Sequence, residues 1–288
     1  MDRSRNATHR SGLILLCLIA LGVLFLWGFL ARPTDDNRVR DNDALFRKNI
    51  PEHLADVQTL YVMPGGGSGA GVDGVKDGYP EWSRRRVVAA HEHFKRKNRK
   101  SLFLALSAGS LNTANALHED GRVKFECQHM IEHLVELGVP RQSILGDFMS
   151  WDTVTNALYL RMVVSGVMAA QRKSVRHGHK LDVEVFISDF HADRVQAAFN
   201  WVMGLRPSLL PHVEFAINKV SSEGIEWPNK DTFDSRLAHE QKGVEQIKAN
   251  AETIKSVEEL YAFITLGPHR GFFDYMHHRL PLKKGGGW

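Results

Sequence analysis

Cysteine is almost absent from this 288-residue chain, and its scarcity excludes two kinds of structural site. The two cysteines, Cys17 and Cys127, lie in an apolar N-terminal segment and in a predicted helix, so we expect no disulfide framework and no cysteine zinc site. Basic residues are not concentrated in one block either. The net charge of +4 is spread along the chain and accompanies no recognisable DNA or RNA motif, so we expect no nucleic-acid partner.

The chain also lacks the residue patterns of common nucleotide and metal enzymes. No Lys-Ser or Lys-Thr follows the glycines at 65–67, which disfavours a Walker-type ATPase. Gly65, Gly67 and Ala70 satisfy G-x-G-x-x-A, but the second predicted strand does not end in the acidic residue of a dinucleotide fingerprint. The histidine pairs lack carboxylates at a convincing spacing, so we expect no metal site, and a metal-dependent hydrolase is the weakest hypothesis. These pairs are His91/His93, His177/His179 and His277/His278.

The N-terminus carries a long apolar run. Residues 12–31 contain no charged side chain, and about 20 such residues in a helix match the thickness of the bilayer hydrocarbon. We therefore predict a transmembrane signal anchor that follows a short tail, residues 1–11. A cleaved signal peptide is the alternative, although its apolar core usually has about 7 to 15 residues and Phe29-Leu30-Ala31 fits a cleavage site poorly.

Arginines flank the predicted anchor on both sides, so counting Lys and Arg does not decide its orientation. We favour the tail inside, because a long folded domain can be translocated regardless of its charges and the basic tail contains no acid except Asp2. The protein would then be single-pass, with its soluble domain on the luminal or extracytoplasmic side of the membrane. Residues 32–56 are charged and weakly periodic, which predicts a stalk.

Beyond the stalk the hydrophobic period switches repeatedly between that of a strand and that of a helix. This alternation predicts an α/β fold with a doubly wound parallel sheet of about five strands over residues 57–220. Helical periodicity between Ser235 and Ile264 predicts that residues 221–288 form a helical C-terminal extension packed on the domain. The predicted strands are 60–63, 102–106, 144–145, 183–187 and 213–217, and the helices between them are 83–98, 125–137, 153–170 and 192–203.

A small or polar cluster follows each of the first four predicted strands. The carboxyl ends of parallel strands meet at one edge of an open α/β sheet, which is where such folds bind ligands. We therefore expect Gly66, Ser107, Asp147 and His191, one from each cluster, to line a common cleft.

Consecutive glycines after the first strand allow backbone N–H groups to approach an anion closely. We expect Gly65, Gly66 and Gly67, with Ser107 and Gly109 of the second loop, to cradle an anionic ligand. A tight surface loop without a ligand would need the same glycines.

The third loop supplies further candidate ligand-binding residues. Ser150 is expected to be the N-cap of the next helix, with Thr153 and Asn156 on one face of its first turns. Alternatively, Ser150 is only a helix cap, Thr153 a packed β-branched residue and Asn156 a surface amide, and none of them binds a ligand.

In the fourth loop, His191 and Arg194 are spaced to face the same way at the start of a helix. Positive charge there opposes the helix dipole, so Arg194 requires an anionic ligand or a carboxylate such as Asp147 or Glu126. We predict that Arg194 neutralises the ligand and that His191 is a general acid/base oriented by Glu126 or Asp147. The alternative is that Arg194 is an ordinary surface arginine and that the hydrogen bonds of His191 are satisfied within the protein.

The clusters belong to an ordered series of short motifs. The series comprises Gly65-Gly66-Gly67, Arg84/Arg85, Ser107-x-Gly109, Glu126, residues 133–140, Ile144-x-x-Asp147-x-x-Ser150-x-Asp152-Thr153-x-x-Asn156-Ala157 and Phe190-His191-x-x-Arg194. Over residues 58–205 it resembles the domain of unknown function 218 family, the group of YdcF-like and SanA/ElyC-like proteins. The resemblance implies a Rossmann-like domain, often behind one transmembrane helix, with bacterial members linked to cell-envelope integrity. It implies no established reaction, although binding of an S-adenosylmethionine-like nucleotide has been proposed within the family.

Two positions depart from the pattern of that family. Its usual Ser-Gly-Gly is Ser107-Ala108-Gly109 here, and its usual Glu after the third strand is the shorter Asp147. Residues 260–263 and 269–275 are similar to an extension in eukaryotic members, so we expect a eukaryotic member. The segments outside the bacterial pattern are the stalk, residues 167–180 and the tail after Pro228.

The sequence therefore predicts a membrane-anchored α/β domain that binds a phosphorylated or nucleotide-like small molecule. Hydrolysis or transfer at a phosphoryl or glycosyl-phosphate group is the enzymatic hypothesis. One alternative is a non-catalytic, membrane-anchored interaction protein of membrane or envelope biogenesis. Another is an S-adenosylmethionine-like nucleotide binder. The sequence specifies no cofactor.

Overall fold

The computed structural model describes residues 52–67, 79–97, 99–110, 115–171, 180–225 and 233–267. The chain divides after Pro51 into two units, and all described residues belong to the second, Glu52–Trp288. The predicted tail and membrane anchor lie outside the described residues, as do the stalk up to Pro51 and the pairs His177/His179 and His277/His278.

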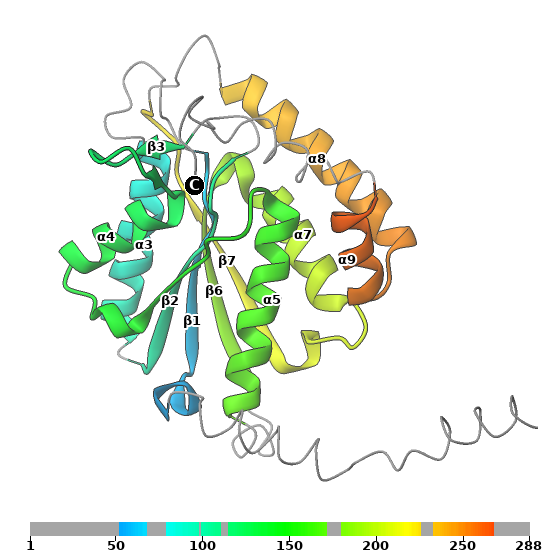
Figure 1. Ribbon diagram of the computed structural model, residues 1–288, viewed down its shortest axis with the longest axis horizontal. Helices are drawn as coiled ribbons and strands as arrows, with labels where there is room; N and C mark the ends of the chain where they lie inside the picture. Colours follow the sequence, from blue (N-terminus) through cyan, green and yellow to red (C-terminus); the bar gives the residue numbers. More distant parts are fainter. Residues whose placement is uncertain are drawn as a thin grey trace, which may run out of the picture. The chain divides into compact units, whose positions relative to one another are not determined.

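A five-stranded parallel sheet forms the centre of the domain (Figure 1). Its strands run in the order β5-β2-β1-β6-β7, and every neighbouring pair is parallel. The strands are β1 (Thr59–Met63), β2 (Ser101–Ala105), β5 (Ile144–Gly146), β6 (Leu181–Ser188) and β7 (Val213–Val220). Residues of β1 are buried throughout, because helices cover both faces of the sheet, and this double burial explains the continuous apolar runs in the sequence. The predicted α/β fold with a parallel sheet of about five strands is confirmed.

Two pairs of helices cover the two faces of the sheet (Figure 1). The first pair packs around Phe103 and Met130, and the second pair packs around Leu104 and Phe199. The chain changes face between β5 and β6, so the strand order reverses at the gap between β1 and β6. The first pair is α3 (Glu81–Lys97) and α4 (Glu126–Glu136), and the second is α5 (Thr153–Ala170) and α7 (Ala192–Gly204).

Two further helices, α8 (Phe233–Thr253) and α9 (Val257–Thr265), follow the sheet and lie beside α7 (Figure 1). Ile247 of α8 and Leu260 of α9 are buried in the same apolar core as α5 and α7. The helices of the C-terminal extension thus share a core with the sheet domain.

Several short elements connect the main ones. The last five residues of the predicted stalk form η1 (Glu52–Asp56), and Leu54 within it packs against the core. A small antiparallel hairpin, which the sequence did not predict, stands between β2 and α4. Its strands are β3 (Ala116–Leu117) and β4 (Val123–Lys124), and the remaining short helices are η3 (Arg141–Ser143), η4 (Asp189–His191) and η5 (Leu210–His212).

Among the described residues, one helix is long and apolar enough to cross a membrane by length and composition, and it is α5. However, 44% of this helix is buried inside the domain, and Val154, Leu160 and Val164 lie in the core. The composition of α5 is therefore explained by its place beside α7 in the apolar core.

Candidate functional site

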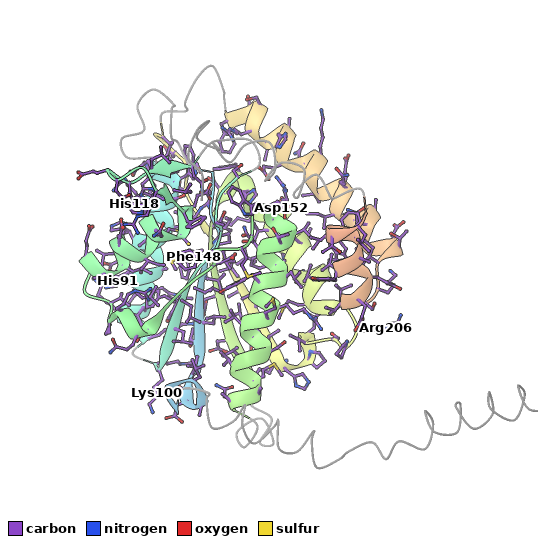
Figure 2. The ribbon with its side chains drawn as sticks, viewed as in Figure 1. His91, Lys100, His118, Phe148, Asp152 and Arg206 are labelled. Atoms are coloured by element: carbon purple, nitrogen blue, oxygen red, sulfur yellow. The ribbon has the colours of Figure 1, made fainter. Side chains whose placement is uncertain are left out.

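The polar clusters after the strands lie at one edge of the sheet, because all five strands are parallel. Asp152, at the first turn of α5, lies toward this edge, whereas Lys100, just before β2, lies at the opposite end (Figure 2). Direct contacts join the first three loops. Gly65 lies against Ser107, and the Ser107 amide donates to the Asp147 carboxylate over 3.2 Å.

The glycine loop after β1 has side chains packed closely against it. A Cβ on Gly65 would lie 2.4 Å from Oε2 of Glu126 and 2.4 Å from Cβ of Ser107. A Cβ on Gly66 would lie 2.4 Å from Nε1 of Trp82, whose indole N–H donates to the Gly66 carbonyl over 3.0 Å. Gly67 has a φ of 89°, in the left-handed region that favours glycine. Packing at Gly65 and Gly66 and the positive φ at Gly67 therefore explain why each of these positions is a glycine.

Ser107, the second residue after β2, is strained. Its φ of 95° is rarely adopted by residues with a side chain, and such strain of about 1–3 kcal/mol clusters at functional sites. The Ser107 hydroxyl donates to the Gly109 carbonyl over 2.9 Å. Gly109 is itself enclosed, because a Cβ there would lie 2.4 Å from Oδ1 of Asn115 and 2.7 Å from Cζ3 of Trp151.

The Asp147 carboxylate organises the loop between β5 and α5. It is fully buried and accepts hydrogen bonds from the backbone amides of Ser107, Met149 and Ser150. The Ser150 hydroxyl also donates to it. Four donors thus satisfy this carboxylate without His191, so the prediction that Asp147 orients His191 is wrong.

The N-cap of α5 is Asp152, not Ser150 as predicted. Asp152 accepts from the Thr155 amide over 2.7 Å, and the Thr155 hydroxyl accepts from the Asp152 amide over 3.1 Å, which makes a capping box. Ser150 precedes this cap and is buried against Asp147 and Asn156. Thr153 and Asn156 are buried as well, so neither is a surface residue.

His191 is oriented by a carboxylate from the C-terminal extension. Its Nδ1 atom lies 2.6 Å from Oε2 of Glu240, in the middle of α8. Glu126 was the other predicted partner, but it begins α4 on the opposite face of the sheet and lies against Gly65. Glu240 was missed, because nothing local in the sequence of α8 distinguishes it from the other charged residues of that helix.

Arg194 shares the same carboxylate, with its Nη1 atom 3.2 Å from Oε2 of Glu240. Its side chain lies across Gly243, where a Cβ would come within 2.7 Å of the arginine Cδ. The charge that was predicted to neutralise a ligand therefore already faces a carboxylate, Glu240.

In the cluster of His191, Arg194 and Glu240, the pKa values of His191 and Glu240 are both shifted. Burial alone would raise the pKa of Glu240, but the hydrogen bond and charge of His191 and the charge of Arg194 lower it to about 2. Burial lowers the pKa of His191, and the hydrogen bond to Glu240 opposes this effect. Glu240 is therefore ionised and His191 neutral near pH 7, so Nδ1 carries the hydrogen and Nε2 is the basic nitrogen.

Arg86 of α3 is a second residue at this edge that the sequence alone did not single out. It is fully buried, and its Nε donates to the Ser188 hydroxyl over 3.0 Å while Nη1 donates to the Pro64 carbonyl over 2.7 Å. Burial lowers its pKa to about 10, against the charges of Glu126 and Glu240, so it is a cation at neutral pH. Helical spacing could have revealed it, because it lies four residues from both Trp82 and Ala90 on the buried face of α3.

The described residues contain no group of three or more His, Cys, Asp and Glu side chains arranged to hold a metal ion. The pair His91/His93 packs against aromatic rings of the core, with His91 near Phe94 and His93 near Phe186. These two histidines thus have a packing role.

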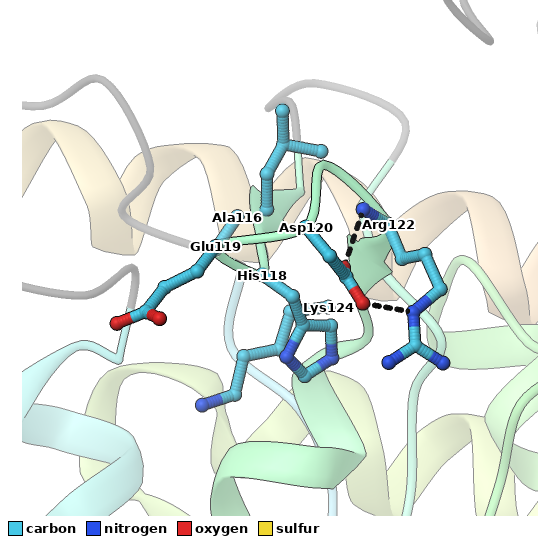
Figure 3. Close-up of a pocket in the computed structure, with 7 residues that line it drawn as sticks. Ala116, His118, Glu119, Asp120, Arg122 and Lys124 are labelled. Atoms are coloured by element: carbon cyan, nitrogen blue, oxygen red, sulfur yellow. Dashed lines mark hydrogen bonds and ion pairs between the residues drawn. The ribbon is translucent and has the colours of Figure 1, made fainter.

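A hollow of about 560 Å³ lies at the β3–β4 hairpin, away from the contacts described above (Figure 3). Its charged lining is mixed in sign, and Asp120 accepts from both the amide and the Nε of Arg122. The lining residues are Ala116, Leu117, His118, Glu119, Asp120, Arg122 and Lys124.

Comparisons of the chain with family models, with curated proteins and with solved structures found no match.

Proposed function

We propose that this α/β domain binds an anionic, phosphorylated or nucleotide-like small molecule at the strand ends and acts there as a hydrolase or transferase. The observation that carries the proposal is the 2.6 Å contact between His191 and Glu240 at the end of β6, beside the buried cation Arg86. Open parallel sheets bind ligands where the strand order reverses, and the gap between β1 and β6 is that place.

The pair supports acid–base chemistry at a phosphoryl or glycosyl-phosphate group. Glu240 holds His191 in one tautomer, which leaves Nε2 free to take a proton. In hydrolysis, Nε2 takes the proton of a water whose oxygen attacks phosphorus. The bond from phosphorus to the leaving oxygen breaks, and that oxygen receives the proton from the imidazolium. In transfer, an acceptor hydroxyl replaces the water.

The strand order, with glycines after β1 and a reversal beside it, supports a Rossmann-like doubly wound assignment. The motif resemblance to the domain of unknown function 218 family supports the same assignment. We also propose that residues 12–31 anchor the chain in a membrane as a single span, with the domain on the luminal or extracytoplasmic side.

One observation favours the non-catalytic alternative, an anchored interaction protein. Several polar groups at the strand ends are engaged within the fold, since Asp147 accepts backbone and hydroxyl donors and Arg194 faces Glu240. A scaffold would use these groups for stability alone.

The test uses the full-length chain in detergent with His191→Ala and, as a matched control, His212→Ala at an exposed position. Both are incubated with panels of phosphomonoesters, phosphodiesters and glycosyl phosphates, and products are followed by phosphorus NMR. We expect product from the parent chain and from His212→Ala but not from His191→Ala.

Absence of both product and calorimetric binding across the panel would end the enzymatic proposal. Normal cellular function of a folded His191→Ala/Arg194→Ala variant would favour the scaffold.

A further inference from the structure

The guanidinium of Arg86 joins two neighbouring strand ends. Pro64 follows β1 and Ser188 ends β6, so the hydrogen bonds from Nη1 and Nε place this buried cation at the point where the strand order reverses. The third nitrogen, Nη2, is buried and has no hydrogen-bond acceptor among the described residues. A buried N–H of a charged group without an acceptor destabilises the fold, so the position favours an acceptor supplied by a ligand.

The guanidinium lies directly against the glycine loop. A Cβ on Gly66 would lie 3.1 Å from Nη1 of Arg86, whereas Gly66 itself is partly exposed. The backbone of Gly66, which carries no side chain, therefore lies between solvent and the buried guanidinium of Arg86.

The charges around Arg86 limit how negative a ligand can be. Arg194 already faces Glu240, so its charge is matched within the protein. The carboxylates of Glu126, Glu240 and Asp189 act on Arg86 electrostatically, although none of the described carboxylates forms an ion pair with it. Arg86 can balance one negative charge of a ligand, whereas a second negative charge would be repelled by the nearby carboxylates. The site therefore favours a ligand group with one negative charge over a group with two.

We propose that the strand-end site recognises a phosphodiester group, with one negative charge, through Arg86, whose Nη2 donates to a phosphate oxygen. This inference rests on the proposed function, because it names the substrate class of the same site. It separates phosphodiesters from phosphomonoesters, which carry about two charges near pH 7 because their second pKa is about 6.

The first test needs no variant. Binding of dimethyl phosphate and of methyl phosphate to the full-length chain is measured by calorimetry at constant ionic strength, at about pH 5.5 and about pH 7.5, which bracket the monoester pKa of about 6. We expect the diester to bind equally at both pH values, and the monoester to bind about tenfold more tightly at the lower pH, where it carries one charge. A monoester that binds at the higher pH as tightly as the diester would overturn the assignment, as would acetate binding as tightly as the diester.

The second test compares two buried arginines. Arg86→Lys keeps the charge but loses the guanidinium fork, and Arg161→Lys makes the same change where three backbone carbonyls, of Val202, Met203 and Pro207, satisfy the side chain. We expect Arg86→Lys to weaken diester binding about 10- to 100-fold and Arg161→Lys to leave it unchanged. Equal affinity in Arg86→Lys and the parent would show that Nη2 does not hold the ligand.

The outcomes separate the two proposals. If the parent chain binds no phosphate compound, the proposed function fails first. If it binds phosphate compounds but Arg86→Lys or the charge of the ligand makes no difference, only the assignment of Arg86 and of the phosphodiester class fails.

Discussion

His191 and Glu240 are 49 positions apart in the chain, yet Nδ1 of one lies 2.6 Å from Oε2 of the other in a buried contact. The C-terminal extension thus contributes directly to the strand-end site of the sheet domain. Because the contact is both buried and charged, it couples the stability of the fold to pH and the position of α8 to the site.

The first prediction concerns acid stability. The pKa of Glu240 is about 2 in the folded chain against an ordinary 4.5, so the unfolded chain binds its proton more readily. The stability that this carboxylate contributes, about 1–3 kcal/mol, is fully present above about pH 4.5 and is lost as the pH falls toward about 2. We expect Glu240→Gln to reduce the slope of unfolding free energy against pH in that window, measured by urea denaturation.

The exposed Glu245→Gln on the same helix is the control, and it should leave the slope unchanged. Identical pH profiles for Glu240→Gln and the parent chain would show that the buried contact does not form in solution.

The strands and helices were predictable because each has a clear hydrophobic period. The predicted helix at 153–170 has the bounds of α5, since a buried face and a capping signal agree there. The cap itself was misassigned because Ser150 and Asp152 are both good N-cap residues. In the structure Thr155 completes the capping box of Asp152, but Thr153 stands at the same spacing after Ser150, so the sequence alone does not distinguish the two.

The partner of His191 could not be predicted in the same way. Of the 21 residues of α8, a fully described helix, only Glu240 and Ile247 are buried, so most of its charged residues face solvent. Only the packing of α8 on α7 and η4 selects Glu240 from among them. Arg86 differs, because its position on the buried face of α3 is visible in the helical spacing of the sequence.

A second prediction compares two glycines. Gly65→Ala would place a Cβ 2.4 Å from Glu126 and Ser107, so we expect it to destabilise the fold by about 1–3 kcal/mol and to weaken anion binding. Gly166→Ala, inside α5, meets nothing within 4 Å and should stabilise the fold by up to about 1 kcal/mol. Chemical denaturation of both variants measures the contrast. If both substitutions stabilise the fold, the glycine loop is not packed as described.

A third prediction concerns the buried carboxylate of the third loop. Asp147→Asn replaces an acceptor of four hydrogen bonds by an amide that donates on one side, so at least one of the donors from Ser107, Met149 and Ser150 loses its acceptor. We expect a loss of about 1–3 kcal/mol in unfolding free energy. Asp120→Asn, on the exposed hairpin, should cost less than about 0.5 kcal/mol. Equal losses in urea denaturation would contradict the organising role of Asp147.

The last prediction asks how firmly α8 is held. Ile247 is 4% exposed in the core shared with α7, so Ile247→Ala should cost about 2–4 kcal/mol by leaving a cavity. Because most side chains of α8 face solvent, we expect part of this loss to appear as local opening, with faster amide exchange in α8 than in β1. Opening of α8 would also remove Glu240 from His191, so the variant should lose the pH dependence attributed to that contact.

Tyr261→Ala, at a position 63% exposed on α9, is the control. It should leave amide exchange unchanged and should change stability by no more than about 0.5 kcal/mol. Uniform acceleration of exchange in α8 and β1 would instead mean that the extension and the sheet unfold only together.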